Sequence, residues 1–281
     1  MQNQVISRQG QATTIILLFL LIIRFVDGLR PQGFWTDNVV PFAYAHATIV
    51  FALLALVIFL NKSDLANLNI DRTFISFYIF SATLLSVWLG LSVLGSISLG
   101  IAFSEWIWLA LFGTITSLST VFVVFLRRTK KLTFKINQSL PSLLAGSLLG
   151  IMPVLIFRFL CTTTGLTNFS QGFLASIKTV EILWNIVFIL WGIVYEEMLF
   201  RGMIWAFLRE RNCGNVKILI IQALLFWLCH LNLVSTISFW FALPIISLWF
   251  GFLVLRYKSL IPSAMTHLVY NFLAVIMRAA L

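Results

Sequence analysis

Charged side chains are scarce in this chain of 281 residues, since Asp, Glu, Lys and Arg together make up only 10% of it. A soluble domain carries roughly 25%. Hydrophobic residues account for 60%, and the mean hydropathy is +1.02. A chain with so few polar groups cannot coat a water-facing surface, and its long apolar runs favour a bilayer as its solvent.

Cysteine is also scarce. The three cysteines, Cys161, Cys213 and Cys229, match neither a zinc-ligand spacing nor a disulfide framework. We interpret them as small apolar side chains within helices.

A cleavable signal sequence is not indicated at the N-terminus. The apolar stretch 15–23 is followed by Arg24, and no small-residue cleavage site follows it. We therefore expect a retained first helix that either spans the membrane or lies at its surface. Arg24 is close to the end of that helix, so we expect its side chain to reach the interface.

Apolar runs long enough to span a bilayer recur along the chain. They lie near 13–29, 39–60, 74–96, 103–126, 138–160, 181–207, 216–234, 236–255 and 260–279. The stretch 161–180 is predicted to be an interfacial or re-entrant connection. The sequence thus predicts an all-α, polytopic transmembrane helix bundle of about eight or nine spans, with no soluble domain.

The net charge is +10, and the basic residues that produce it lie mainly in short loops between the apolar runs. The sequence has no aromatic–basic pattern of the kind that binds single-stranded nucleic acid. We therefore exclude nucleic acid as a partner. The loop 127–135 holds five basic residues and should be cytoplasmic. The connections around 209–217 and 256–258 should lie on the same side. We expect an integral protein of the plasma or cytoplasmic membrane, with the polar site described next opening toward the cytoplasm.

Three charges fall inside predicted spans, away from the helix ends: Glu196, Glu197 and Arg201. Such residues are costly in a bilayer and usually have a partner and a function. Glu197 and Arg201 are four residues apart, so they share a helical face and are predicted to form an ion pair. Alone, this cluster is equally compatible with a structural ion pair.

Two of the three histidines, His230 and His267, lie in later predicted spans. Phe226 precedes His230 by one turn, and Asn271 follows His267 by one turn. A rise of 1.5 Å per residue puts the polar groups on all three helices about 10–22 Å from the predicted cytoplasmic ends. A buried polar site shared by three helices would explain this agreement. His46 has no companion at helical spacing and is interpreted as structural or interfacial.

These residues resemble the three motifs of the CPBP family, the CAAX-processing endopeptidases and bacteriocin-processing enzymes also called Abi proteins. The motifs EExxxR, FxxxH and HxxxN match, in order, Glu196, Glu197, Arg201, Phe226, His230, His267 and Asn271. The resemblance covers roughly 180–278. It implies two regions: 1–180, with N-terminal transmembrane helices and the interfacial connection, and 181–281, a CPBP-like catalytic helix core.

The resemblance implies an intramembrane endopeptidase, with the lipid bilayer and a membrane-associated peptide or protein as its partners. By this analogy, Glu196, supported by His230, activates a water molecule to attack a peptide carbonyl. His267 and Asn271 donate hydrogen bonds to the developing oxyanion. Supporting roles are implied for Glu197, Arg201 and Phe226.

A divalent metal such as zinc is the alternative catalyst. Glu196, His230 and His267 would supply three ligands, with water as the fourth. However, the sequence contains no HExxH motif, and an asparagine is a better oxyanion donor than zinc ligand. We therefore favour a mechanism without a metal or other cofactor.

Two further functions compete with proteolysis. One is a non-enzymatic membrane protein of the same fold, acting in bacteriocin self-immunity or as a scaffold. The other is a transporter with a buried proton relay, for which inverted repeats and broken helices are expected but not seen. Among protease substrates, prenylated CaaX proteins, peptide precursors and membrane proteins all remain open.

Overall fold

The computed structural model describes residues 8–29, 39–60, 74–75, 78–80, 82–83, 140–163, 167–169, 189–190, 192–233 and 238–279. The predicted span 103–126, most of the predicted span 74–96 and the basic loop 127–135 lie outside the described residues.

The described chain is helical apart from one short pair of strands, which agrees with the all-α prediction. The helices are α1 (Arg8–Gly28), α3 (Val39–Leu60), α6 (Leu140–Thr163), η1 (Glu197–Met203), α9 (Ile204–Glu210), α10 (Asn215–Leu228), η2 (Leu231–Leu233), η3 (Ser238–Ala242), α11 (Leu243–Tyr257) and α12 (Ile261–Ile276).

The strands β1 (Thr167–Phe169) and β2 (Met277–Ala279) pair in antiparallel fashion, with Asn168 opposite Arg278. The last predicted span, 260–279, is therefore wrong at its end, because its final three residues are extended. Pairing with β1 supplies backbone hydrogen bonds that a frayed last helical turn would lack.

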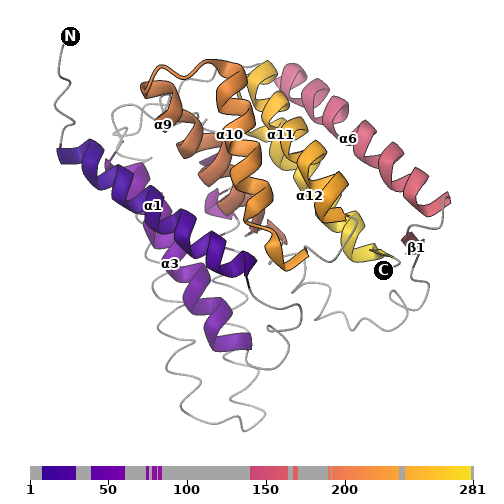
Figure 1. Ribbon diagram of the computed structural model, residues 1–281, viewed down its shortest axis with the longest axis horizontal. Coiled ribbons are helices and arrows are strands. Elements are labelled where there is room, and N and C mark those ends of the chain that lie inside the picture. Colours follow the sequence, from indigo (N-terminus) through magenta and orange to yellow (C-terminus); the bar gives the residue numbers. More distant parts are fainter. Residues whose placement is uncertain are drawn as a thin grey trace, which may run out of the picture.

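Four helices, α6, α10, α11 and α12, lie side by side, while α1 and α3 pack together on the other side of η1 and α9 (Figure 1). The most extensive contact joins α6 to α12, and α11 packs against both α10 and α12. The N-terminal helix α1 also contacts η1. Helices from both ends of the sequence therefore meet around the segment that carries the two glutamates.

Large apolar side chains face outward along several of these helices, among them Phe19 on α1, Leu148 on α6, Ile220 on α10 and Ile245 on α11. Among the described residues, Phe239–Tyr257 is the one helix that is both long and apolar enough to cross a membrane, and four shorter apolar helices accompany it. Apolar faces of this extent require an apolar surrounding. A lipid bilayer supplies one, and helices suit it because they satisfy their own backbone groups.

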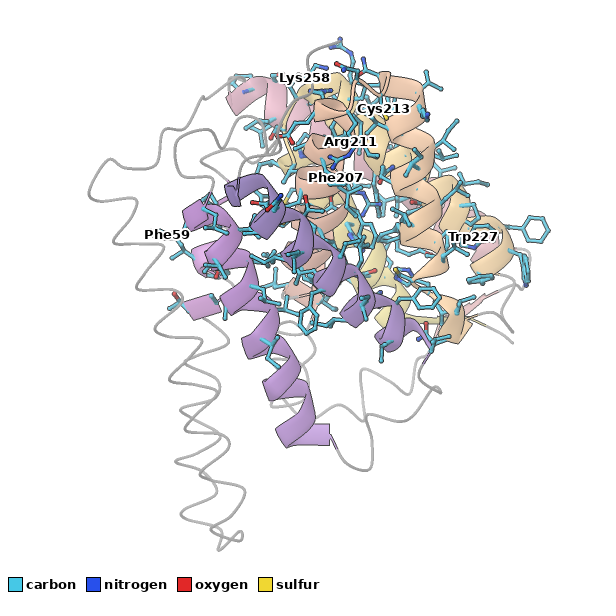
Figure 2. The ribbon with its side chains drawn as sticks, turned by 60° about the vertical axis from the view of Figure 1, so that its left-hand side comes forward. Phe59, Phe207, Arg211, Cys213, Trp227 and Lys258 are labelled. Carbon is cyan, nitrogen blue, oxygen red and sulfur yellow. The ribbon has the colours of Figure 1, made fainter. Side chains whose placement is uncertain are left out.

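The basic connections share one end of the bundle. Lys258 follows α11, and Arg211 and Cys213 follow α9, at the same end of the molecule (Figure 2). Lys258 and Asn212 have positive φ angles of 53° and 58°, which end the preceding helices in left-handed turns. This grouping of positive charge is the pattern expected of one membrane side.

Two glycines allow α6 to approach its neighbours closely. A Cβ atom at Gly146 would lie 2.9 Å from the ring of Tyr257, and one at Gly150 would clash with Oγ1 of Thr266. Small residues one turn apart are a common means of close helix packing in membranes.

We predict that Gly150→Val separates α6 from α12 and lowers the stability of the protein by about 1–3 kcal/mol, the usual cost of overpacking. Thermal unfolding in detergent measures this. Gly192→Val is the matched control, since nothing lies within 4 Å of a Cβ added there. Equal unfolding temperatures for the two variants would contradict the proposed packing.

Candidate functional site

The two adjacent glutamates lie where a helix changes its winding. Residues 192–196 are α-helical, but Glu197–Met203 form a π-helix in which the Ile204 N–H bonds to the Leu199 carbonyl, five residues back. A π-helix has more residues per turn than an α-helix, so neighbouring side chains diverge less, and such segments often occur at functional sites. The sequence indicated a regular helix here. Glu196 directly precedes the π-helix and Glu197 begins it, and both carboxylates reach one histidine, His267.

The Glu197 carboxylate is fully buried and has three partners. The hydroxyl of Ser263 donates to its Oε2 at 2.6 Å, and Nδ1 of His267 lies 3.0 Å from its Oε1. Arg201 Nη1 is 3.4 Å from the same oxygen, so the predicted i, i+4 ion pair is present. An ionised carboxylate only accepts hydrogen bonds. His267 Nδ1 therefore carries the hydrogen, which leaves Nε2 as an acceptor in the neutral ring.

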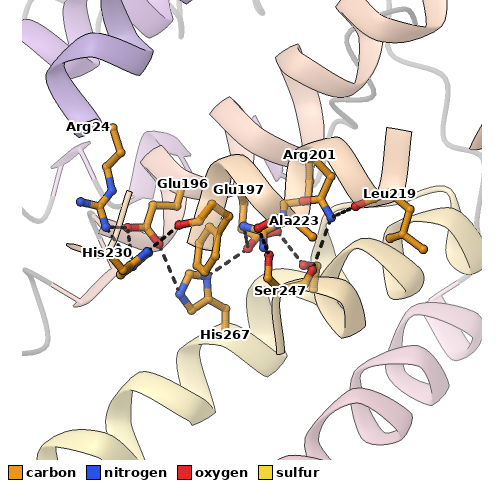
Figure 3. Close-up of polar contacts among 12 residues, drawn as sticks. Arg24, Glu196, Glu197, Arg201, Leu219, Ala223, His230, Ser247 and His267 are labelled. Atoms are coloured by element: carbon orange, nitrogen blue, oxygen red, sulfur yellow. Dashed lines mark hydrogen bonds and ion pairs between the residues drawn. The ribbon is translucent and has the colours of Figure 1, made fainter. Parts of the chain in front are cut away.

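The Glu196 carboxylate faces the other side of His267. Its Oε2 is 3.5 Å from His267 Nε2, and its Oε1 is 3.8 Å from His230 Nε2. Its closest partner is Arg24, whose Nη2 lies 2.6 Å from Oε1 (Figure 3). The structure thus brings Glu196, His230 and His267 together from three segments of the chain.

Arg24 was expected at the membrane interface, and that prediction is wrong. Its side chain is only 13% exposed and also contacts His230, with Nη2 2.9 Å from Nε2. The physical reason is the buried Glu196, since a nearby cation offsets the cost of desolvating a carboxylate. The one signal in the sequence was a charge inside an apolar run, and α1 is too far away in sequence for spacing to reveal its partner.

His230 does not lie within a helix, although the predicted span 216–234 included it. The helix α10 ends at Leu228. The Phe226 carbonyl, which would accept the backbone N–H of residue 230 in an α-helix, instead lies 2.7 Å from Nδ1 of the His230 ring. The backbone N–H turns to the Trp227 carbonyl. A carbonyl cannot donate, so Nδ1 carries the hydrogen and Nε2 presents a lone pair to the site.

Aromatic rings enclose the polar groups. Phe226, 1% exposed, lies 4.6 Å from the His230 ring and 5.8 Å from the His267 ring, centroid to centroid. The Arg201 guanidinium stacks 4.1 Å from the Phe226 centroid. Phe250 adds a second wall, 4.7 Å from the His267 ring. These rings exclude water and give the buried guanidinium a cation–π surface.

Two polar residues of α12, Asn271 and Ser263, lie close to His267 in the sequence. Asn271 lies one turn after His267 on α12 and is half-buried, and within the described part of the chain it has no hydrogen bond to the other site residues. Ser263, on the same helix, was not singled out from the sequence, because a serine in an apolar helix carries no specific signal.

With the Arg24 guanidinium in place, the described side chains leave no position for a divalent metal between Glu196 and His230. Among the described residues, no group of three or more His, Cys, Asp or Glu side chains is placed to hold a metal ion. The set considered from the sequence was Glu196, His230 and His267. Arg24 contacts the first two of these, so while it is in place any metal or water between Glu196 Oε1 and His230 Nε2 would meet a guanidinium at contact distance.

The arrangement combines two acceptors aimed at one point, Glu196 Oε1 and His230 Nε2, with a second histidine that is fixed from behind by Glu197. A pair of acceptors of this kind can orient a water molecule and remove its proton. The wall of aromatic rings keeps bulk water out, which strengthens each electrostatic contact.

Comparison with known families identifies one matching region. Residues 178–273 match the family model described as type II CAAX prenyl endopeptidase Rce1-like. No curated protein and no solved structure matches the chain. The matched region contains both glutamates, both histidines and Asn271, and it excludes α1 and Arg24.

We predict that Arg201→Met destabilises the protein by about 3–5 kcal/mol, because it leaves the buried Glu197 carboxylate without its cation. Accumulation in membranes and thermal unfolding in detergent measure the loss. Arg209→Met is the matched control, since Arg209 is exposed. If both variants accumulate and unfold as the wild type does, the Glu197–Arg201 ion pair does not contribute to the stability of the protein.

Proposed function

We propose that this chain is an intramembrane endopeptidase that uses Glu196 and His230 to activate water, since residues 178–273 match the family model of the type II CAAX prenyl endopeptidase Rce1-like proteins. The observation that carries the proposal is the convergence of Glu196 Oε1 and His230 Nε2, 3.8 Å apart, on one point inside an apolar bundle. Two acceptors at that separation hold a water molecule through its two hydrogens and leave its lone pairs directed outward.

In the proposed reaction, the water oxygen forms a bond to the peptide carbonyl carbon while Glu196 takes the proton. The carbonyl oxygen becomes an oxyanion. When the intermediate collapses, the C–N bond breaks and the proton passes to the leaving amine. The other proton of the water stays on the acyl product, so the products are a carboxylic acid and an amine. One water molecule is consumed and no redox partner is needed.

Oxyanion stabilisation is assigned to His267 and Asn271. His267 Nδ1 donates to Glu197, so Nε2 becomes a donor only when the ring takes a second proton. Glu196 Oε2 lies 3.5 Å from Nε2, so the proton that Glu196 takes from the water is shared with this nitrogen until it passes to the leaving amine. The Asn271 amide lies one turn further along α12 and needs no proton transfer to donate.

Glu197, Ser263 and Arg201 act in this scheme as positioning residues. Ser263 and Arg201 hold the Glu197 carboxylate, and that carboxylate fixes the orientation and tautomer of His267. A base or donor that is already held in one orientation loses no further conformational entropy when the reaction occurs. The proposed substrate is a membrane-associated peptide or protein. The outer faces of the helices around the site are apolar and suit a lipid bilayer, so a substrate that reaches the site would come from the membrane.

The expected effect of Glu196→Gln is a loss of proteolysis of about 10²–10⁴-fold, the usual contribution of a general base. The fold should persist, because glutamine keeps the size and hydrogen-bonding capacity of the side chain. Mass spectrometry of new peptide termini in membranes that contain wild type or variant measures the activity and identifies the substrate.

Glu210→Gln serves as the control, since this carboxylate is exposed at the end of α9. A second arm adds a chelator, and termini that persist support the metal-free scheme. Termini that are unchanged by Glu196→Gln would refute the catalytic role. If wild-type membranes yield no new termini at all, a non-enzymatic role in self-immunity or as a scaffold replaces the proposal.

A further inference from the structure

Arg24 occupies the centre of the proposed reaction site. One nitrogen, Nη2, lies 2.6 Å from Glu196 Oε1 and 2.9 Å from His230 Nε2. These two atoms are the acceptors that the proposed mechanism assigns to the nucleophilic water. Figure 3 shows the guanidinium extending from α1 to this point.

The amino group at Nη2 carries two hydrogens, as a water molecule does. His230 Nε2 bears a lone pair, because Nδ1 donates to the Phe226 carbonyl. Glu196 Oε1 accepts as well. Nη2 therefore donates one hydrogen to each acceptor and reproduces both contacts that a bound water would make.

Arg24 and the water exclude each other. Both contacts to Nη2 are within hydrogen-bonding distance, so no space remains between the guanidinium and either acceptor for another heavy atom. The guanidinium has no nucleophilic lone pair to offer a peptide carbonyl, and it engages the oxygen of Glu196 that would accept the proton.

The position of Arg24 in the chain allows it to leave. It lies one turn before the end of α1 at Gly28, on a helix outside the matched region 178–273. Its counterpart Arg201 differs: it is 0% exposed, lies on η1 itself and is stacked on Phe226. Of the two cations, only Arg24 comes from a separate part of the chain and is partly exposed.

We propose that Arg24 is an autoinhibitory side chain, which holds the site closed by occupying the position of the nucleophilic water and must withdraw before hydrolysis. This inference rests on the proposed function. It assigns α1 a regulatory role. A substrate or partner that draws α1 or Arg24 away from η1 opens the site. Without one, Glu196 Oε1 and His230 Nε2 stay hydrogen-bonded to Arg24.

The test uses two readouts on the full-length protein in membranes. The first is modification of Glu196 by dicyclohexylcarbodiimide, a lipid-soluble carboxyl reagent, measured by mass spectrometry. It needs no substrate and no proteolysis. The second is the rate of appearance of the new termini. Arg24→Met removes the guanidinium and keeps an apolar chain of similar length.

If the closed form holds about nine-tenths of the molecules, removing it raises both the Glu196 modification rate and kcat/KM about tenfold. Glu197 is the internal control, because its own pair with Arg201 is untouched and it should stay unmodified. Ile22→Met is the matched control on α1, since Ile22 faces outward and is 59% exposed.

Arg24→Lys covers the case in which the methionine variant fails to accumulate. Lysine keeps the positive charge near Glu196 but is shorter, so it should raise both rates by a smaller factor. Unchanged modification of Glu196 in both variants would overturn the contact, and a fall in cleavage despite increased modification would overturn the inhibitory role.

The outcome also separates this inference from the function on which it rests. If no variant cleaves anything, the endopeptidase proposal fails, and increased Glu196 modification still supports Arg24 as the residue that closes the site. If wild type cleaves and Arg24→Met cleaves no faster, the function stands and the inhibitory role is refuted.

Discussion

Two adjacent carboxylates inside an apolar bundle are the constraint on which this structure depends. Glu196 and Glu197 are 8% and 0% exposed, and an isolated buried carboxylate is far too costly to keep. Each has its own guanidinium, Arg24 for the first and Arg201 for the second. The charges balance within the site, which lets the surrounding helices remain almost wholly apolar.

The two ion pairs differ in what they can do. Glu197 and Arg201 belong to one short segment, and Ser263 and the aromatic rings fix them further, so that pair can hardly open without unfolding. Glu196 and Arg24 come from segments far apart in the sequence, and their side chains are 10% and 13% exposed. The proposed autoinhibitory role requires this pair to break while the fold persists, with His230 and His267 left as the partners of Glu196.

The backbone departs from regular helix at two places beside the site. The π-helix Glu197–Met203 directs two neighbouring carboxylates to opposite nitrogens of His267. The early end of α10 frees His230 to bond the Phe226 carbonyl and to present Nε2 to the site. The π-helix keeps a backbone bond from the Ile204 N–H to the Leu199 carbonyl, and after α10 the His230 side chain takes up the Phe226 carbonyl.

The sequence by itself determined the helical class, the apolar character and the cluster of Glu196, Glu197, Arg201, His230 and His267, because a charge in an apolar run and a one-turn spacing are local signals. Tertiary structure alone decided the partner of Glu196, the strand pair β1–β2 and the two irregular turns. Arg24 meets its carboxylate through the packing of α1 on η1, and Ser263 meets Glu197 through the packing of α12. Contacts between distant segments depend on how whole helices pack, and no local spacing in the chain encodes that.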